Sequence, residues 1–192
     1  LNSVLKTEDK DYVVAMDTDS VYITMDEMVK QIFPEDTPKD KIIDFLRKSE
    51  GQIEQVLADG FKDLAQYTNA FQQKMQMGRE VIADRGIWTA KKRYILNVWD
   101  SEGVRYDEPK LKMMGIEAVK SSTPAPCRTM IKDALKLMMN GTEEDVIDFI
   151  DDSRKQFKKL PPEDIAFPRT ASNVQKYRSI ASIYEKGTPI HI

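Results

Sequence analysis

The sequence predicts an α+β fold in which antiparallel strands backed by one long helix form the first part, and helices dominate the second. Three observations predict it. Two β-prone runs flank an acidic turn at 17–20, another β-prone run with a basic start covers 88–99, and helical periodicity occupies about 40–69 and the region beyond 123. Strands and helices in separate stretches are typical of α+β domains. We expect the first part to cover 1–122 and the second 123–192.

The first strand pair is predicted around the tetrapeptide Asp17-Thr18-Asp19-Ser20. Tyr12–Met16 and Val21–Met25 are rich in β-branched and aromatic residues, whereas the tetrapeptide has turn composition. We therefore expect a tight hairpin that presents two carboxylates. Residues two apart in an extended chain project to one side, about 6–7 Å apart, where two bare carboxylates repel by roughly 2–3 kcal/mol.

A divalent cation at this hairpin would remove the repulsion. Mg²⁺ takes oxygen ligands and is held by one or two protein carboxylates plus substrate phosphates, so the arrangement suits phosphoryl or nucleotidyl transfer. A polar turn whose side chains only cap backbone groups is the alternative interpretation.

A long helix is predicted from about Asp40 to Asn69. Apolar residues recur there at three, four or seven positions and form one stripe, namely Leu46, Ile53, Leu57, Phe61 and Leu64. We expect this stripe to pack against the back of a sheet, a structural role without chemistry.

Two further strands are expected at about 74–83 and 89–99, followed by a turn at 100–103 that leads into 104–106. The second strand carries Lys91, Lys92 and Arg93 at its start. Strand alternation would place Lys92 with Tyr94 on one face and Lys91 with Arg93 on the other. Such cations can grip a sugar-phosphate backbone, although a solvated strand end would look the same.

The second part is predicted to hold two helices. Thr123 looks like the N-cap of the first, with Pro124 at its first position and a stop at Asn140-Gly141. Thr142 opens the next helix, which closes on Lys155, Lys158 and Lys159. These lysines either interact favourably with the negative end of the helix dipole or face a nucleic-acid duplex, and both interpretations stay open. A small element is expected at 173–178.

Composition restricts the class of function. A net charge of −3 gives no overall basic signature, so any nucleic-acid surface must be local. The single Cys127 excludes an internal disulfide, and with His191 as the only histidine, Cys/His catalysis and zinc clusters are disfavoured. With no secretory signal and no apolar run of about 18 residues, we expect a soluble cytoplasmic protein without membrane contact.

Together the motifs resemble the palm of family B DNA polymerases. Asp17-Thr18-Asp19-Ser20 matches that family's third polymerase motif, and Lys91-Lys92-Arg93-Tyr94 matches its primer-gripping lysine-tyrosine motif. A third block, 108–124, resembles the segment that leads from palm to thumb, and its Ser-Ser-Thr-Pro ending is most like the replicative enzymes of T-even-type phages. The resemblance covers nearly the whole chain, with a palm segment at 1–122 and a thumb portion at 123–192.

The resemblance implies template-directed nucleotidyl transfer from a dNTP to a primer 3′-hydroxyl with two Mg²⁺ ions. By this resemblance Asp19 would ligate both ions, and Asp17 would be an auxiliary, weaker or outer-shell ligand beside the primer terminus. Glu80 matches an acidic residue near the metal site with a supporting role, and Thr18 falls at a nucleotide-binding position.

The resemblance also assigns residues that bind primer-template DNA. Lys91, Lys92 and Tyr94, with Arg93 in the same motif, would hold the primer strand. Lys120 would reach the minor groove of the duplex.

Two departures from the family pattern limit this reading. The stretch Asp84-Arg85-Gly86-Ile87 is short where the T-even-type enzymes carry a longer, Gly- and Pro-rich insertion. The second metal-binding aspartate and the basic fingers helix lie upstream in the family and have no room within residues 1–16. We therefore expect a piece of a phage-encoded polymerase that is inactive alone and works in an infected host cell.

The ends of the chain favour the same interpretation. Residues 1–5 lack an initiator Met and resemble the last turn of a helix, and 188–192 resemble a strand cut short. The expected partners are the N-terminal, exonuclease and fingers regions of the polymerase, with a sliding clamp as a candidate.

Two alternatives remain open from the residues themselves. An Asp-x-Asp motif on a strand end also occurs in nucleotide-sugar glycosyltransferases, which would require a nucleotide-binding half before residue 17. A non-catalytic duplex-binding module would keep the lysine grip without turnover.

Overall fold

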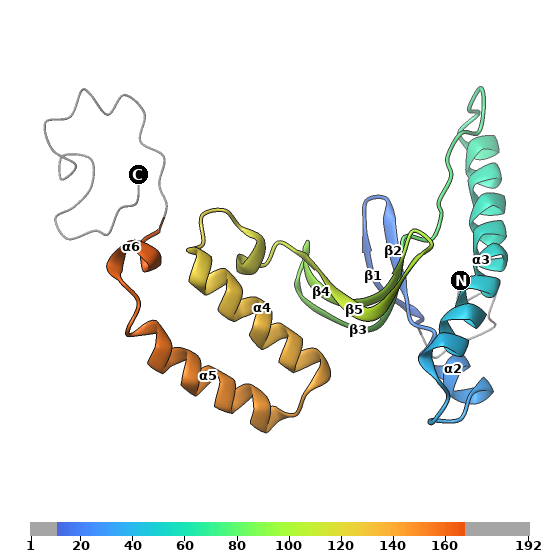
Figure 1. Cartoon of the computed structure of the whole chain (residues 1–192). Coiled ribbons are helices and arrows are strands. Elements are labelled where there is room, and N and C mark those ends of the chain that lie inside the picture. The colour runs from blue at the N-terminus through green and yellow to red at the C-terminus, as the bar shows by residue number, and fades with distance from the viewer. Residues whose placement is uncertain (1–10, 168–192) are drawn as a thin grey trace, which may run out of the picture. The chain divides into compact units, whose positions relative to one another are not determined.

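The computed structural model describes residues 11–167, and Figure 1 shows their helices and strands. The chain forms two compact units. Unit 1 joins the residues up to Asp84 with Val98–Lys110, and unit 2 joins Arg85–Asn97 with the residues from Leu111 onward. Strands and helices occupy separate stretches of the chain, so the predicted α+β class is confirmed.

Unit 1 begins with the predicted hairpin. Strands β1 (Val13–Asp17) and β2 (Ser20–Ile23) pair antiparallel, with Val13 opposite Ile23 and Asp17 opposite Ser20. The tight connection between them is the two-residue turn Thr18-Asp19, as the sequence predicted. On β1 the side chains of Val14 and Met16 are 55% and 71% exposed. One face of the hairpin is therefore open to solvent.

Two helices follow in unit 1, namely α2 (Asp26–Ile32) and the long α3 (Lys39–Tyr67). The predicted helix at about 40–69 is confirmed. Ile43 is the buried residue of α3. The predicted stripe is half-buried from Leu46 to Phe61, and Leu64 is exposed.

The beginning of α3 is fastened to β5 by one arginine. Arg105 donates hydrogen bonds to Asp40 Oδ1 at 2.6 Å and to Asp44 Oδ1 at 2.8 Å. Because these carboxylates lie four residues apart on the helix, they share one face and meet the same guanidinium. The packing of the apolar stripe of α3 against the back of the sheet stays a prediction.

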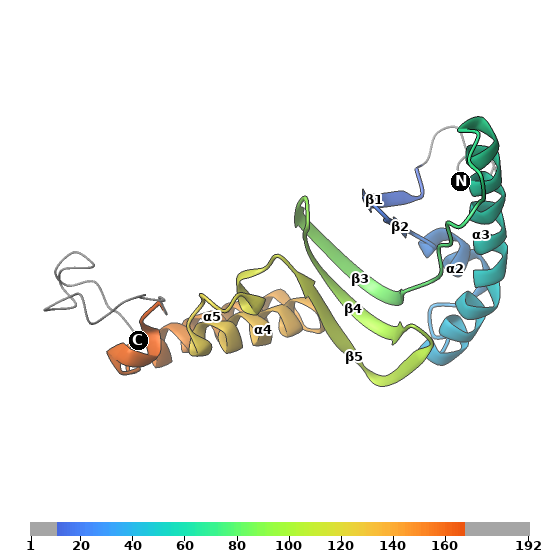
Figure 2. The same ribbon diagram turned by 90° about the horizontal axis from the view of Figure 1, so that it is seen from above.

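A three-stranded sheet has the order β3-β4-β5, formed by β3 (Val81–Ala90), β4 (Arg93–Ser101) and β5 (Val104–Met114). Two-residue connections join the strands, which makes the sheet antiparallel. In the second connection Glu102 and Gly103 both have positive φ angles, 50° and 85°, as a type I′ turn requires. Figure 2 shows the three strands side by side.

The sheet differs from the prediction at two places. The strand expected at 74–83 begins only at Val81, and 73–80 has no regular structure. The strand expected at 89–99 is divided by a turn at Lys91-Lys92, so these lysines do not alternate across a strand. The predicted turn within 100–103 is confirmed.

The core of unit 2 consists of Ile95 on β4, Ile116, Ala118 and Met139, with partly buried apolar residues packed around them. Met139 lies near the end of α4 (Ala125–Asn140) and Ala118 in the 3₁₀ helix η1 (Glu117–Val119). Arg85 donates a hydrogen bond to the Met139 carbonyl oxygen. The end of α4 is thereby fixed to β3.

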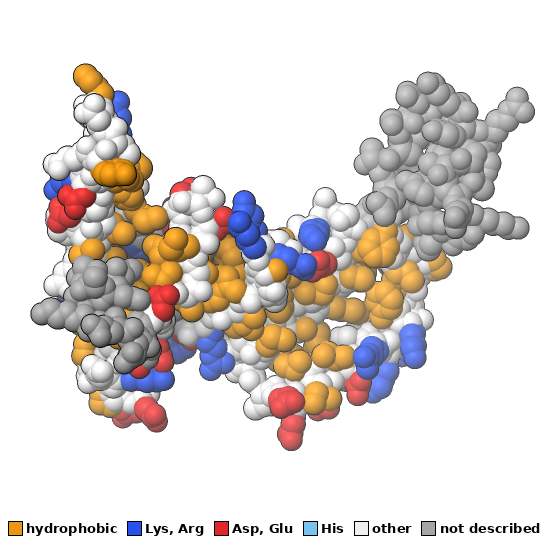
Figure 3. All heavy atoms as spheres, turned by 180° about the vertical axis from the view of Figure 1, so that it is seen from behind, with side chains coloured by type: hydrophobic (Ala, Val, Ile, Leu, Met, Phe, Trp, Pro, Cys, Tyr) orange, Lys and Arg blue, Asp and Glu red, His pale blue; other side chains and the backbone are white. Residues whose placement is uncertain are grey.

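Helix α5 (Glu143–Phe157) packs against α4, and the short α6 (Pro162–Ile165) follows. Thr142 caps α5 as predicted and forms a capping box with Asp145. Thr123 does not cap α4, because the N-cap residue is Pro124 and Thr123 is buried. Figure 3 shows hydrophobic side chains at the surface of this helical region, where Met138, Ile147 and Ile150 are exposed.

No helix within residues 11–167 has the length and apolar character needed to cross a lipid bilayer. The expected features at 1–5, 173–178 and 188–192 lie outside the described residues. The two compact units do not test the predicted division at residue 122, which stays a prediction.

Candidate functional site

The β1–β2 turn holds its two aspartates in a strained backbone. The Asp19 N–H donates to the Asp17 carbonyl at 2.6 Å, and the Ser20 hydroxyl donates to the same oxygen at 3.1 Å. Thr18, between the aspartates, has a φ of 50°. A β-branched residue in the left-handed region is an outlier that costs about 1–3 kcal/mol and is found mainly at functional sites.

This turn exposes its acidic groups. Asp19 and Thr18 are exposed and Asp17 is half-buried at the end of β1, while the Thr18 hydroxyl donates to Asp17 Oδ1 at 3.1 Å. Since Asp19 lies in the turn itself, the extended-chain geometry assumed from the sequence does not apply. The strained turn, rather than strand alternation, determines where the second carboxylate points.

The hairpin offers an incomplete set of metal ligands. Within residues 11–167 there is no cluster of three or more His, Cys, Asp or Glu side chains that could hold a metal ion. Mg²⁺, however, is commonly held by one or two carboxylates together with substrate phosphates and waters. An exposed and a half-buried carboxylate at one turn fit such a shared site, which substrate phosphates and waters would complete.

Glu80 lies in unit 1, directly before β3, where two contacts fix the backbone. Its carbonyl oxygen accepts the Glu102 N–H at 2.7 Å. The preceding Arg79 donates from Nε to Glu50 at 2.8 Å and from Nη1 to Asp100 Oδ1 at 2.5 Å. Asp100 is fully buried and also accepts the Gly103 N–H at 3.1 Å.

This ion-pair network is stable in its charged form. Burial lowers the pKa of Arg79, but its hydrogen bonds to Glu50 and Asp100 outweigh this and leave the pKa above its ordinary value. Removing either carboxylate would leave the largely buried Arg79 with one of its two partners, which is costly. The segment that carries Glu80 is therefore fixed to α3 and to the β4–β5 turn.

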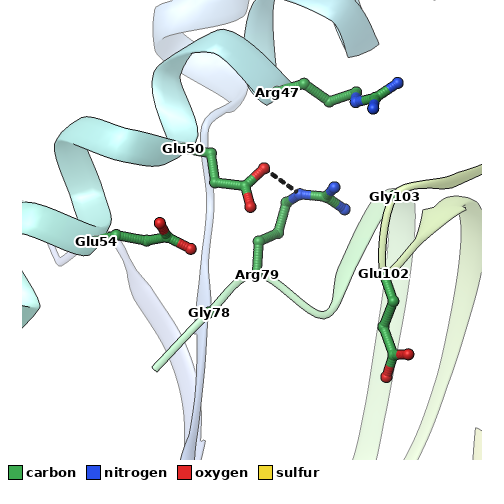
Figure 4. Close-up of a pocket in the computed structure, with 7 residues that line it drawn as sticks. All are labelled: Arg47, Glu50, Glu54, Gly78, Arg79, Glu102 and Gly103. Carbon is green, nitrogen blue, oxygen red and sulfur yellow. Dashed lines mark hydrogen bonds and ion pairs between the residues drawn. The ribbon is translucent and has the colours of Figure 1, made fainter. Parts of the chain in front are cut away.

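A cavity of about 450 Å³ adjoins this network. Figure 4 shows its lining side chains and the Glu50–Arg79 ion pair. The lining consists of Arg47, Glu50, Glu54, Gly78, Arg79, Glu102 and Gly103. None of the predicted site residues lines it, and among its lining carboxylates Glu50 pairs with Arg79, while Glu102 points away from both arginines (Figure 4). This composition indicates a structural ionic cluster rather than a place for chemistry.

The second predicted motif forms the β3–β4 turn in unit 2. Lys91 and Lys92 are exposed there, and Lys92 has a φ of 60°. Gly115, which follows β5 and has a φ of 66°, lies against this turn. A Cβ atom on Gly115 would lie 2.3 Å from the Lys92 carbonyl oxygen and 2.9 Å from Arg93 Cγ. Only glycine fits here, both for its backbone conformation and for the space available.

Arg93, Glu117 and Lys120 form a connected group beside the turn. Arg93 Nη2 donates to both Glu117 oxygens, at 2.8 and 2.7 Å, and Lys120 Nζ donates to Glu117 Oε1 at 3.0 Å. The Lys120 hydrogen bond is the main reason that the pKa of Glu117 lies below its ordinary value, and the charges of Arg93 and Lys120 add to it. Glu117 is therefore ionised at neutral pH.

Tyr94 differs from the exposed residue that the motif suggested. It is 7% exposed, and its ring lies 6.4 Å from that of Trp88, with 38° between the planes. The proposed contact of its hydroxyl with a primer strand stays a prediction.

The structure therefore gathers the predicted residues in two groups. Asp17, Thr18 and Asp19 share the hairpin of unit 1, in the same unit as Glu80, and the basic residues 91–94 and Lys120 belong to unit 2. Sequence reasoning missed Gly115 and Glu117. The available signals were a glycine between a strand and a 3₁₀ helix, and a glutamate three residues before a lysine.

Comparison with known proteins decides between the interpretations. The chain is 37% identical to the DNA-directed DNA polymerase of Escherichia phage RB69, in an alignment that covers all of this chain and 22% of that protein. It is homologous to phage DNA polymerases. The DNA-directed DNA polymerase of Enterobacteria phage T4 is 32% identical over 92% of this chain and 21% of its own length. No protein-family model matches the chain.

The homology confirms the resemblance to family B DNA polymerases and disfavours a glycosyltransferase. The chain spans about a fifth of the length of these two polymerases. Both relatives come from phages, as the Ser-Ser-Thr-Pro ending of the third block predicted. The roles of individual residues stay predictions.

Proposed function

We propose that this chain is the part of a DNA-directed DNA polymerase that presents a catalytic carboxylate hairpin and grips the primer strand. The observation that carries the proposal is the strained Thr18 turn, which displays Asp19 in a chain homologous to two phage DNA polymerases. The catalytic unit would be a longer chain that contains these residues, called the intact polymerase below.

In this proposal the hairpin residues act on the reacting groups. The primer 3′-hydroxyl attacks the α-phosphate of a dNTP, a bond to that phosphorus forms, and pyrophosphate leaves. Asp19 would be the main ligand of two Mg²⁺ ions, and Asp17 a weaker ligand beside the primer terminus. When bound, these ions would stabilise the negative charge on the attacking and leaving oxygens. Thr18 would lie against the nucleotide, and Glu80 would support the site.

The basic residues would position the DNA. Lys91 and Lys92 lie in an exposed turn, where their charges can approach the primer backbone, and Lys120 would reach the minor groove. Contacts of this kind fix the register of the duplex without reading its sequence. They would hold the primer strand while other parts of the intact polymerase supply the dNTP site.

The 192-residue chain alone would bind duplex DNA without turnover. A two-metal transfer needs a carboxylate opposite Asp19, and among residues 11–167 there is no cluster that would supply it. We therefore expect the isolated chain to act as a duplex-binding module and the intact protein to act as a polymerase.

The test is primer extension by the intact polymerase carrying Asp19→Ala. Loss of a principal metal ligand removes several kcal/mol of transition-state stabilisation, which corresponds to a fall of about a thousandfold or more in single-turnover rate. Affinity for primer-template should be retained, because the aspartate does not hold DNA.

Asp17→Ala should reduce the rate less than Asp19→Ala does. Asp36→Ala is the matched control, since this exposed aspartate lies in the loop before α3 and should leave extension unchanged. Extension at an ordinary rate by the Asp19→Ala enzyme would refute the assignment.

A further inference from the structure

Two cations assigned above to DNA binding share one acidic partner. Arg93 begins β4 and Lys120 follows η1, and both donate hydrogen bonds to the carboxylate of Glu117 at 2.7–3.0 Å. A carboxylate beside a surface that binds a polyanion opposes binding through its charge. The presence of Glu117 here therefore needs a reason other than simple attraction of DNA.

The backbone around Glu117 is held firmly. Its neighbours Ile116 and Ala118 are 6% and 1% exposed and belong to the core of unit 2. Gly115, one residue further back, lies against the Lys92 carbonyl. Glu117 therefore projects from a segment that is held by the hydrophobic core of unit 2 and, through Gly115, by the Lys91-Lys92 turn.

The pairing with Glu117 engages one nitrogen of the Arg93 guanidinium. Its Nη2 donates to both carboxylate oxygens, and its Nε is buried. The side chains of Arg93 and Glu117 are still 41% and 46% exposed, so the pair lies at the surface. An arginine held in this way orients its neighbours more readily than it binds a phosphate.

We propose that Glu117 is a positioning residue, which holds Arg93 and Lys120 in place so that Lys120 and the Lys91-Lys92 turn meet a primer-template duplex together. Arg93 acts as part of this support and is not itself a principal DNA ligand. The inference rests on the proposed function. It adds a residue that the lysine-tyrosine motif does not contain.

The proposal predicts an effect opposite in sign to that of charge alone. If Glu117 were only a counter-charge, Glu117→Ala would strengthen DNA binding by removing repulsion. If Glu117 is a positioning residue, its loss frees the side chains of Arg93 and Lys120. Ordering these side chains on DNA binding then costs conformational entropy, which weakens binding. We expect the Kd of the intact polymerase for primer-template to rise about two- to fivefold, the size typical of orienting surface ion pairs.

The experiment measures this Kd for wild type, Glu117→Ala, Glu117→Gln and Asp133→Ala over a range of salt concentrations. Gln keeps one oxygen that accepts hydrogen bonds, so its Kd should lie between those of wild type and Glu117→Ala. Asp133 is the matched control, because it is an exposed carboxylate on α4 in the same unit. Its removal should leave binding unchanged or slightly tighter.

A double-mutant cycle gives a readout that a general loss of stability would not produce. In a Lys120→Ala background, Glu117→Ala should weaken binding less than it does in wild type, because one of the side chains it holds is gone. If Glu117→Ala melts at a lower temperature than wild type, the Kd of Glu117→Gln and the double-mutant cycle test the positioning role instead.

Binding by Glu117→Ala that equals or exceeds wild type would overturn the inference, as would additive effects in the cycle. The same assay includes Lys91→Ala/Lys92→Ala. If that double variant weakens binding and Glu117→Ala does not, only the role of Glu117 fails. If wild type does not bind primer-template in low salt, the proposed function fails and this inference fails with it.

Discussion

Single residues in unusual backbone conformations mark both parts of the candidate site. Thr18 and Lys92 have φ angles of 50° and 60°, which non-glycine residues adopt rarely and at some energetic cost. Thr18 separates the two aspartates, and Lys92 belongs to the basic turn. In each case the turn conformation determines the direction in which the charged side chains leave the backbone.

The substitution Gly115→Ala tests whether the conformation of the Lys91-Lys92 turn matters for stability and DNA binding. The added Cβ would lie 2.3 Å from the Lys92 carbonyl oxygen, so either the turn moves or Gly115 leaves its left-handed conformation. We expect a loss of about 1–3 kcal/mol in the free energy of unfolding and weaker primer-template binding. Chemical denaturation and DNA titration measure the two effects.

Gly51→Ala is the control for this substitution. No atom lies within 4 Å of a Cβ placed on Gly51 in the middle of α3, so alanine should stabilise the helix by up to about 1 kcal/mol. Equal effects of the two substitutions would contradict the view that Gly115 supports the turn.

The helices and strands follow their local sequence signals where those signals are complete. The acidic start of α5 and its capping box combine several favourable interactions at one helix end. Thr142 N donates to Asp145 Oδ2 at 2.8 Å, and Asp145 N donates back to the Thr142 hydroxyl at 3.3 Å. The pKa of Asp145 lies below its usual value, mainly because the Thr142 backbone N–H donates a hydrogen bond to its carboxylate.

The capping box makes the start of α5 sensitive to pH. Because the pKa of Asp145 is lower in the folded state, its contribution to stability is full above the unfolded value near 4 and is lost as pH falls through the folded pKa. Thr142→Ala should cost about 1 kcal/mol at neutral pH. Amide exchange at 143–146, corrected for its intrinsic rate, should then be about fivefold faster.

The effect of Thr142→Ala should shrink once the pH has fallen through the folded-state pKa of Asp145, where its carboxylate takes up a proton. Thr129→Ala is the control, since the Thr129 hydroxyl donates only to the Ala125 carbonyl within α4 among the described contacts. The same acceleration of exchange at neutral pH and below the folded-state pKa of Asp145 would speak against the capping box.

Local sequence signals were enough for the hairpin at 17–20, for α3 and for the Thr142 cap, because each depends on residues close in the chain. They failed at Lys91-Lys92, where no glycine or asparagine marks a turn and the matching contact comes from Gly115, after the next strand. The start of β3 was misplaced for a similar reason. Residues 74–80 alternate like a strand, but Arg79 is tied to Glu50 and Asp100 instead.

At the scale of the whole molecule, both units expose some apolar surface. Apolar side chains are exposed on the hairpin, at Val14 and Met16, and on the helices, at Met138 and Ile147. Exposed apolar surface of this kind commonly lies against other protein. The chain also spans about a fifth of the two phage polymerases to which it is homologous, which agrees with our proposal for the intact polymerase.

We propose above all that the lysine turn of this chain grips primer-template DNA in a polymerase. The most direct measurement is a salt titration of primer-template binding by the intact polymerase and its Lys91→Ala/Lys92→Ala variant. Each phosphate contact contributes about 0.9 to the slope of log K against log salt, so the variant should bind more weakly, with a slope shallower by about one to two, on all sequences alike. An unchanged slope and affinity, or a loss that depends on DNA sequence, would contradict the claim.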